Sequence, residues 1–289
     1  AMYAAKNNGR NCYNYFTQSL QDTAQARRRL TNELRGALNN KQLEVYYQPI
    51  IDLQTGLVTK ADALLRWHHP EYGFISPLEF IPLAEETGLI NNISDWVFRQ
   101  SSDKAKRWSG QYSNEFQISI NLSPMQFKLD NHLFITQWKN HLQKIDLSGQ
   151  NVAVEITEGL LLNAEPEVID KLHWLRNAGI QVAIDDFGTG YSSLSYLQKF
   201  DIDYLKIDKS FVNNLENNAN DITLCGAIIL MAHTLGLKVI AEGVETTGQK
   251  KILSDAGCDF AQGYLFSRPV PADVFEKILG AESADSGYA

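Results

Sequence analysis

The sequence has few cysteines, no long apolar run and no excess of basic residues. Its 289 residues include three cysteines, an odd number without a CxxC spacing, which is typical of a reducing compartment. The most apolar stretch, around Ala227–Met231, is far too short to cross a bilayer, and the first residues show no signal-peptide pattern. We therefore expect a cytoplasmic protein, with membrane tethering of a longer protein left open.

The net charge and the histidine pattern argue against two further functions, broad binding of duplex nucleic acid and histidine zinc chemistry. A net charge of −8 gives no support to broad binding of duplex nucleic acid, so any phosphate site is local. The six histidines form no HExxH motif, and His68-His69 lies beside Pro70 in an expected loop, so histidine zinc chemistry is not expected. With 44% hydrophobic residues, the chain can build one large core or two modest domains.

Strand-like and helix-like patterns alternate along most of the chain. A first helix is expected over Gln18–Leu38, where leucines recur every four residues. The expected strands are Leu43–Ile50, Val58–Trp67, Phe116–Leu122, Val152–Thr157, Ile180–Asp185, Tyr204–Asp208, Lys238–Glu242 and Asp259–Tyr264. Helices are expected near 77–87, 92–108, 131–145, 164–178, 192–199, 219–235, 246–256 and 271–279. Eight strands alternating with helices predict an α/β fold, a TIM-like (β/α)₈ barrel, with a doubly wound open sheet as the alternative.

Polar residues stand near the C-terminal ends of these otherwise apolar strands. The clearest case is Asp185-Asp186, which follows the apolar run Val182–Ile184. A buried carboxylate is costly unless it is paired, hydrogen-bonded or bound to a metal. The structural alternative is that Asp186 caps the next helix and Asp185 accepts backbone hydrogen bonds. The complete set is Asn121, Glu155, Asp185, Asp186, Lys206, Glu242 and Gln262.

The strand-end set predicts a metal site, because the ends of barrel strands converge on one mouth. Oxygen ligands without Cys or His favour Mg²⁺ or Mn²⁺. Glu155, Asp186 and Glu242 around Asp185 supply enough carboxylates for two cations sharing Asp185, an arrangement that hydrolyses phosphate esters. Lys206 would orient water or meet the phosphoryl oxygens. Isolated structural ion pairs remain the alternative.

The chain resembles the EAL family of cyclic-di-GMP phosphodiesterases over roughly Leu38–Leu279. The motifs that carry the resemblance occur in family order: YYQPI (46–50), DALLRW (62–67), NLSP (121–124), EITE (155–158), DDFGTGYSSL (185–194), YLKID (204–208), AEGVE (241–245) and QGYLFSRP (262–269). The resemblance implies a barrel whose first strand is antiparallel to the others. It also implies hydrolysis of cyclic-di-GMP to linear pGpG and a homodimer formed through this domain.

The resemblance assigns a role to each matching residue. It implies one metal at Asp62, Asn121, Glu155 and Asp185, and a second near Asp185, Asp186 and Glu242. The nucleophilic water would be held by Lys206 and Glu242, with Glu242 as general base and Gln262 as support. Substrate contacts would come from Gln48, Arg66, Asp208 and Pro269. Glu158 would hold the loop that couples the metal site to dimerisation, which comprises Phe187, Gly188, Thr189, Gly190, Tyr191, Ser192 and Ser193.

One residue departs from the family pattern. Position 62, where the family motif has Glu, is Asp62, whose side chain is shorter by one C–C bond, about 1.5 Å. Misplacement of that size can reduce a rate by roughly a hundredfold. The interpretation that we favour is an enzyme slowed by Asp62. The alternatives are a non-catalytic cyclic-di-GMP receptor and a structural domain that ignores the nucleotide.

The expected domain organisation has four parts. Residues 1–16 resemble the end of a GGDEF domain, which implies a longer tandem protein with an upstream GGDEF-like partner. Residues 17–38 would form a linker helix, 39–280 the EAL barrel and 281–289 a disordered tail.

Overall fold

The computed structural model describes residues 18–128, 132–162, 165–188, 197 and 200–285. The chain divides into two compact units. Unit 1 comprises Ala1–Glu44 and Arg66–Ile90, and unit 2 comprises Val45–Leu65 and Asn91–Ala289. Among the described helices, none has the length and hydrophobicity that a membrane span requires. Residues 66–90, which were expected to belong to the barrel domain, are grouped with the N-terminal helix instead.

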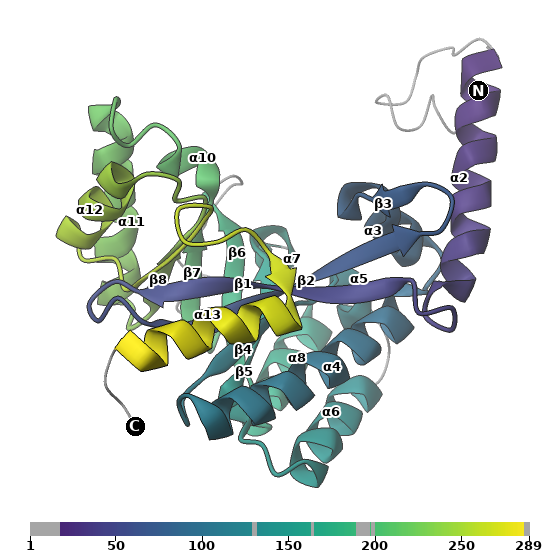
Figure 1. Cartoon of the computed structure of the whole chain (residues 1–289), viewed down its shortest axis with the longest axis horizontal. Coiled ribbons are helices and arrows are strands. Elements are labelled where there is room, and N and C mark those ends of the chain that lie inside the picture. The colour runs from purple at the N-terminus through teal and green to yellow at the C-terminus, as the bar shows by residue number, and fades with distance from the viewer. Residues whose placement is uncertain (1–17, 129–131, 163–164, 189–196, 198–199, 286–289) are drawn as a thin grey trace. The chain divides into compact units, whose positions relative to one another are not determined.

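The strands form a closed eight-stranded barrel whose body lies in unit 2 (Figure 1). The barrel strands are β1 (Leu43–Asp52), β2 (Val58–His69), β4 (Gln117–Asn121), β5 (Val152–Thr157), β6 (Gln181–Phe187), β7 (Tyr204–Ile207), β8 (Lys238–Ala241) and β9 (Phe260–Gln262). Each neighbouring pair from β2 to β9 is parallel, β1 is antiparallel to β9, and a β1–β2 pairing closes the ring. The predicted barrel and its antiparallel first strand are confirmed, and the open-sheet alternative is wrong.

Helices pack outside the barrel, as the βα alternation requires. In unit 2, α8 packs on β6, and α11 packs on β7 and β8. The helices are α2 (Gln18–Ala37), α3 (Pro77–Glu86), α4 (Ile90–Gln111), α5 (Pro124–Phe127), α6 (Leu133–Lys144), α7 (Glu158–Leu162), α8 (Pro166–Asn177), α10 (Lys209–Val212), α11 (Ala219–Thr234), α12 (Thr247–Asp255) and α13 (Ala272–Asp285). Two short strands, β3 (Gly73–Ile75) and β10 (Val270–Pro271), and the short helices α5, α7 and α10 were not expected.

The structure tests the expected tail at 281–289 in part and describes little or nothing of two other expected segments. Helix α13 continues to Asp285, so the first five residues of the expected disordered tail 281–289 are helical. Nearly all of the helix expected over 192–199, and all of residues 1–16, lie outside the described residues.

The packing around β5 shows why its sequence is almost continuously apolar. Every residue of β5 except Thr157 is buried, as is usual for a parallel strand covered on both faces. Elsewhere in unit 2, Trp108 makes edge contacts with Tyr47 at 4.9 Å and with Phe116 at 5.6 Å between ring centroids. Large aromatic side chains therefore fill the layer between the barrel and its outer helices.

A ring of polar side chains lies where β2, β4, β6 and β7 begin. Lys60 Nζ donates to Gln117 Oε1 at 2.8 Å and to the Tyr204 hydroxyl at 2.9 Å. The Tyr204 hydroxyl and Gln117 Nε2 both donate to Gln181 Oε1. Burial, with a smaller effect from Lys238, lowers the pKa of Lys60 to about 7. This ring lies at the strand end opposite to the acidic residues, where conserved polar groups in such barrels usually serve stability.

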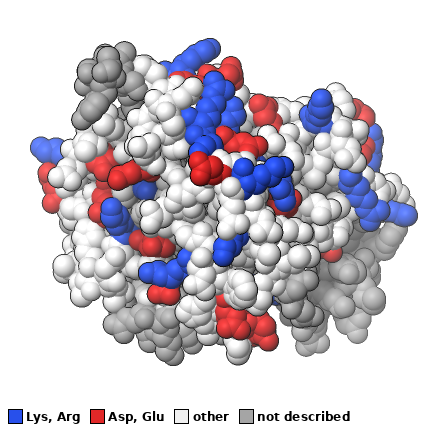
Figure 2. Space-filling view, turned by 90° about the horizontal axis from the view of Figure 1, so that it is seen from below, with Lys and Arg blue, Asp and Glu red and all other residues white. Residues whose placement is uncertain are grey.

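The charged surface residues do not form a basic field on the face shown in Figure 2. Lysine and arginine side chains alternate there with aspartate and glutamate. This mixture agrees with the net charge of −8.

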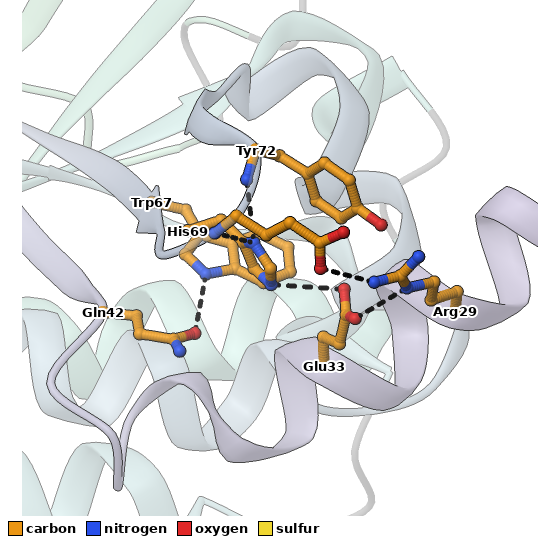
Figure 3. A network of polar contacts seen from close by, with 7 residues as sticks. Arg29, Glu33, Gln42, Trp67, His69 and Tyr72 are labelled. Atoms are coloured by element: carbon orange, nitrogen blue, oxygen red, sulfur yellow. Dashed lines mark hydrogen bonds and ion pairs between the residues drawn. The ribbon is translucent and has the colours of Figure 1, made fainter.

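In unit 1, helix α2 is attached to the β2–β3 hairpin by a polar network (Figure 3). His69 Nδ1 accepts hydrogen bonds from the backbone N–H groups of Glu71 and Tyr72, both at 3.2 Å. The opposite ring nitrogen, Nε2, lies 3.2 Å from Glu33 Oε2. Glu33 also accepts from Arg29 Nε at 3.0 Å. The buried imidazole therefore joins the helix to the hairpin through both of its nitrogens.

Candidate active site

The centre of the site is Lys206, which lies on β7 and is 1% exposed. Its ammonium lies among four carboxylates from four other strands or strand ends. The distances from Nζ are 2.7 Å to Glu155 Oε2, 2.7 Å to Glu242 Oε1, 3.5 Å to Asp62 Oδ2 and 3.6 Å to Asp185 Oδ1. The structure thus brings together the acids that the sequence placed on separate strands.

Strand register explains why these side chains meet. In the parallel pairs, Asn121 is opposite Glu155, and Thr157 is opposite Asp185. Glu242 directly follows β8, and its backbone N–H donates to the carbonyl of Ile207. All of these positions lie at or near the C-terminal ends of the parallel strands, which form one mouth of the barrel.

Burial and mutual repulsion govern the electrostatics of the site. Burial, followed by the charge of Asp62, raises the pKa of Glu155 well above its ordinary value. Burial raises the pKa of Glu242 to about 7, although Lys206 opposes the rise. Burial alone would lower the pKa of Lys206, but the four carboxylates, led by Asp185, hold it well above its usual value. The lysine therefore stays charged and partly compensates the excess of acids.

The donor set fits a hard metal ion. Asp185, Asp186 and Glu242 each offer a carboxylate oxygen within 4.8 Å of the others. Deeper in the site, Asp62 Oδ1 and Glu155 Oε1 are buried and accept no hydrogen bond from the residues described. Buried carboxylate oxygens without partners are costly, and a divalent cation would satisfy them.

A backbone irregularity places the paired aspartates. The β6–β7 register shifts between Ile184 and Phe187, and Asp186 has a left-handed φ of 54°. The Asp186 backbone N–H donates to Asp185 Oδ1 at 3.0 Å. In a regular strand neighbouring side chains point to opposite faces, so this bulge is what lets two consecutive aspartates serve one site.

Gln262 and Gln48 form a hydrogen-bonded wall beside Asp62. Gln262 Nε2 donates to Asp62 Oδ2 at 3.1 Å and to Gln48 Oε1 at 2.9 Å. Gln48 Nε2 in turn donates to the carbonyl of Ser267 at 3.0 Å. These contacts fix the orientation of the shorter carboxylate, which is only 3% exposed.

Glu158 contacts the start of the predicted regulatory loop, whose remainder lies outside the described residues; the regulatory role stays a prediction. Glu158 Oε2 accepts a hydrogen bond from the Gly188 backbone N–H at 3.2 Å. Gly188 has φ +94°, and a Cβ there would lie 2.8 Å from the ring of Phe211. Only glycine fits this position without strain. Residues 189–193 are not described.

Two predicted substrate residues, Asp208 and Pro269, are not brought into this cluster. A third, Arg66, belongs to unit 1, which is described by itself. Asp208 caps α10 by accepting from the Ser210 backbone N–H at 2.9 Å, and Pro269 is half-buried and does not line the cavity. Their substrate roles stay predictions.

The cavity at the mouth includes residues that the sequence interpretation missed. It has a volume of about 350 Å³, and its additional lining residues are Leu64, Lys209, Gly243, Glu245, Gly263 and Tyr264. Lys209 directly follows the YLKID motif, and the other five lie within the DALLRW, AEGVE and QGYLFSRP motifs. That was the only available signal, since none of them is a polar residue that interrupts an apolar strand.

The family model for the EAL domain matches residues 31–269, which include every member of the acid cluster. The chain belongs to the EAL domain family. Together with the barrel, this result confirms the resemblance that the strand-end motifs indicated.

Two Pseudomonas aeruginosa proteins are similar to this EAL domain. The bifunctional diguanylate cyclase/cyclic di-GMP phosphodiesterase MucR is 39% identical over 273 residues, 94% of this chain and 40% of MucR. The cyclic di-GMP phosphodiesterase NbdA is 37% identical over 286 residues, 99% of this chain and 36% of NbdA. The chain therefore spans 40% or less of the length of these relatives.

Solved EAL structures have the same fold. A PaMucR phosphodiesterase in complex with c-di-GMP has a TM-score of 0.80 and 38% identity, covering 86% of this chain and 99% of that one. The EAL enzyme Bd1971 in its cGMP-bound form has a TM-score of 0.84 and 34% identity, covering 90% of this chain and 71% of that one.

Proposed function

We propose that this EAL domain hydrolyses one phosphodiester bond of cyclic-di-GMP and yields linear pGpG, with two divalent cations, Mg²⁺ or Mn²⁺. The observation that carries the proposal is the cluster of four carboxylates around Lys206, with unpartnered buried oxygens on Asp62 and Glu155. The activities named for MucR and NbdA and the nucleotide in the PaMucR structure support the same substrate.

The residues divide between two cation positions. One position would be held by Asp62, Asn121, Glu155 and Asp185. The other would be held by Asp185, Asp186 and Glu242, whose carboxylate oxygens lie within 4.8 Å of one another. When bound, paired cations of this kind supply a nucleophile at neutral pH and stabilise charge on the phosphoryl group.

The chain's own groups position water and transfer the proton. Glu242 would accept the proton of the attacking water, because its carboxylate lines the cavity and lies 2.7 Å from the Lys206 ammonium. Lys206 remains protonated and holds Glu155 and Glu242, each at 2.7 Å. Gln262 would orient the water network through its fixed amide. As the new P–O bond forms and the P–O3′ bond breaks, the released oxygen takes a proton from solvent.

A homodimer and an upstream GGDEF-like domain belong to the same proposal. Helix α11 exposes Ile222, Leu224 and Leu230, whose exposed fractions are 38%, 47% and 69%. Leu230 is the most exposed of the three, and large exposed apolar side chains are frequent at protein interfaces. Leu230→Glu should reduce the mass measured by light scattering from dimer to monomer, whereas an unchanged mass would remove Leu230 from the interface. The whole protein is proposed to be longer and cytoplasmic.

The direct test is turnover of purified protein with cyclic-di-GMP and either Mg²⁺ or Mn²⁺. We expect pGpG from the wild type and none above background from Glu242→Ala. The shorter Asp62 favours one alternative, a receptor that binds the nucleotide without cleaving it. Tight binding in EDTA with no pGpG after long incubation with metal would establish that alternative.

A further inference from the structure

A second lysine, Lys209, lines the cavity and stands apart from the acid cluster. It is the first residue of α10 and is exposed, whereas Lys206 is buried. Within the described part of the chain, its ammonium has no hydrogen bond or ion pair with another side chain. Lys209 lines the cavity together with Asp185 and Glu242. It is therefore an uncommitted cation in the same cavity as the carboxylates.

Lys206 cannot readily serve as the cation that binds substrate phosphate. Four carboxylates lie within 3.6 Å of its Nζ, and the side chain is 1% exposed. A phosphate oxygen could reach Nζ only by displacing one of these carboxylates and leaving it buried without its partner, which is unfavourable. A phosphodiester that enters the cavity from solvent meets Lys209 without that penalty.

The backbone fixes where the Lys209 side chain begins. Gly243, the residue after Glu242, has φ +69°, and a Cβ placed there would lie 2.5 Å from Lys209 Cβ and 3.3 Å from its Cα. Any other residue at 243 would push Lys209 away or strain the turn. The close approach keeps the base of Lys209 beside the strand end that carries Glu242.

We propose that Lys209 binds a phosphodiester oxygen of the substrate at the mouth of the cavity. Lys209, and not Lys206, then has the phosphate-binding role that was first considered for Lys206. This inference rests on the proposed function for the identity of the substrate. A hydrogen bond between an ammonium and a phosphate oxygen is charge-assisted, and it forms here on binding at an otherwise unpaired lysine.

The test compares Lys209→Ala and Lys209→Arg with Lys251→Ala, a matched loss of charge at an exposed residue of α12 that does not line the cavity. For Lys209→Ala we expect KM for cyclic-di-GMP to rise about tenfold and kcat to stay within about threefold. Lys209→Arg should keep KM within about threefold of the wild type. Added salt should raise KM less in Lys209→Ala than in the wild type, because a screened contact has been removed.

Isothermal titration calorimetry in EDTA measures the Kd of cyclic-di-GMP, and thus the same contact, without turnover. There, Lys209→Ala should weaken the Kd of cyclic-di-GMP about tenfold, and Lys251→Ala should leave it unchanged. The Lys209 inference alone is overturned if the wild type forms pGpG and the Lys209→Ala variant has the same KM, Kd and salt dependence as the wild type. A wild type that binds but forms no pGpG would refute the phosphodiesterase proposal and leave the Kd comparison to decide on Lys209. A wild type that neither binds nor hydrolyses the nucleotide would refute both.

Discussion

Replacing Lys206 with methionine removes the ammonium that is buried among the four acids while keeping a side chain of similar length. Both 2.7 Å contacts, to Glu155 and Glu242, lie in the interior, where the side chains are 0% and 20% exposed. Removing one partner of a buried ion pair typically costs about 3–5 kcal/mol, because the other charge is left uncompensated. We expect Lys206→Met to lower the free energy of unfolding of the metal-free protein by about that amount in urea titrations at pH 7.

Divalent cations should reverse part of this loss. A bound cation supplies the positive charge that Lys206 no longer provides, so Mg²⁺ or Mn²⁺ should stabilise the variant more than the wild type. Lys171→Met is the matched control, because Lys171 is equally buried, at 1% exposure, and donates to the carbonyl of Phe127. It should lose stability without any change in its response to metal. A Lys206→Met variant within 1 kcal/mol of the wild type, or one stabilised by metal no more than the wild type, would refute the reasoning.

Three further substitutions test other parts of the structure. The pKa of Lys60 is about 7 in the folded protein and 10.5 in its ordinary state, so the unfolded chain binds more protons between these values and stability rises with pH across that window. Lys60→Met should abolish this rise, which is on the order of 5 kcal/mol in urea titrations. A variant with the wild-type pH profile would contradict the assignment. Asp62→Glu should raise kcat at least about tenfold if the short carboxylate limits the rate, whereas an unchanged kcat would show that Asp62 is already well placed. Gly188→Ala should cost about 1–2 kcal/mol because of its positive φ and the Phe211 ring, and a loss below 0.5 kcal/mol in the same titration would count against that strain.

The main architecture was predictable because its signals are strong and local. Strand β5 begins and ends at the predicted residues, Val152 and Thr157, since its apolar run is bounded by polar residues. The strands β3 and β10 have three and two residues, too few to show a period of two, and were missed for that reason. The antiparallel direction of β1 came from the family resemblance alone, because hydrophobic patterns do not encode strand direction.

Much of the site was also predictable, but its internal contacts were not. The acids were found because each polar residue interrupts or ends an apolar strand. The four carboxylates around Lys206 depend on barrel closure, which brings together residues as distant as Asp62 and Glu242. The left-handed backbone conformation at Asp186 depends on the β6–β7 register, and no local sequence pattern predicts it. Lys209 was overlooked because an exposed lysine at a helix start is ordinary in sequence.

The most direct test of the account is the location of metal ions in crystals grown with Mn²⁺ and cyclic-di-GMP. Anomalous difference density identifies manganese without reference to the chemical argument. The account predicts two peaks at the barrel mouth, with Asp185 oxygens bound to both ions and Asp62 bound to one. The absence of density at saturating Mn²⁺, or ions bound away from these carboxylates, would contradict the claim that the strand-end acids form a metal centre for phosphodiester hydrolysis.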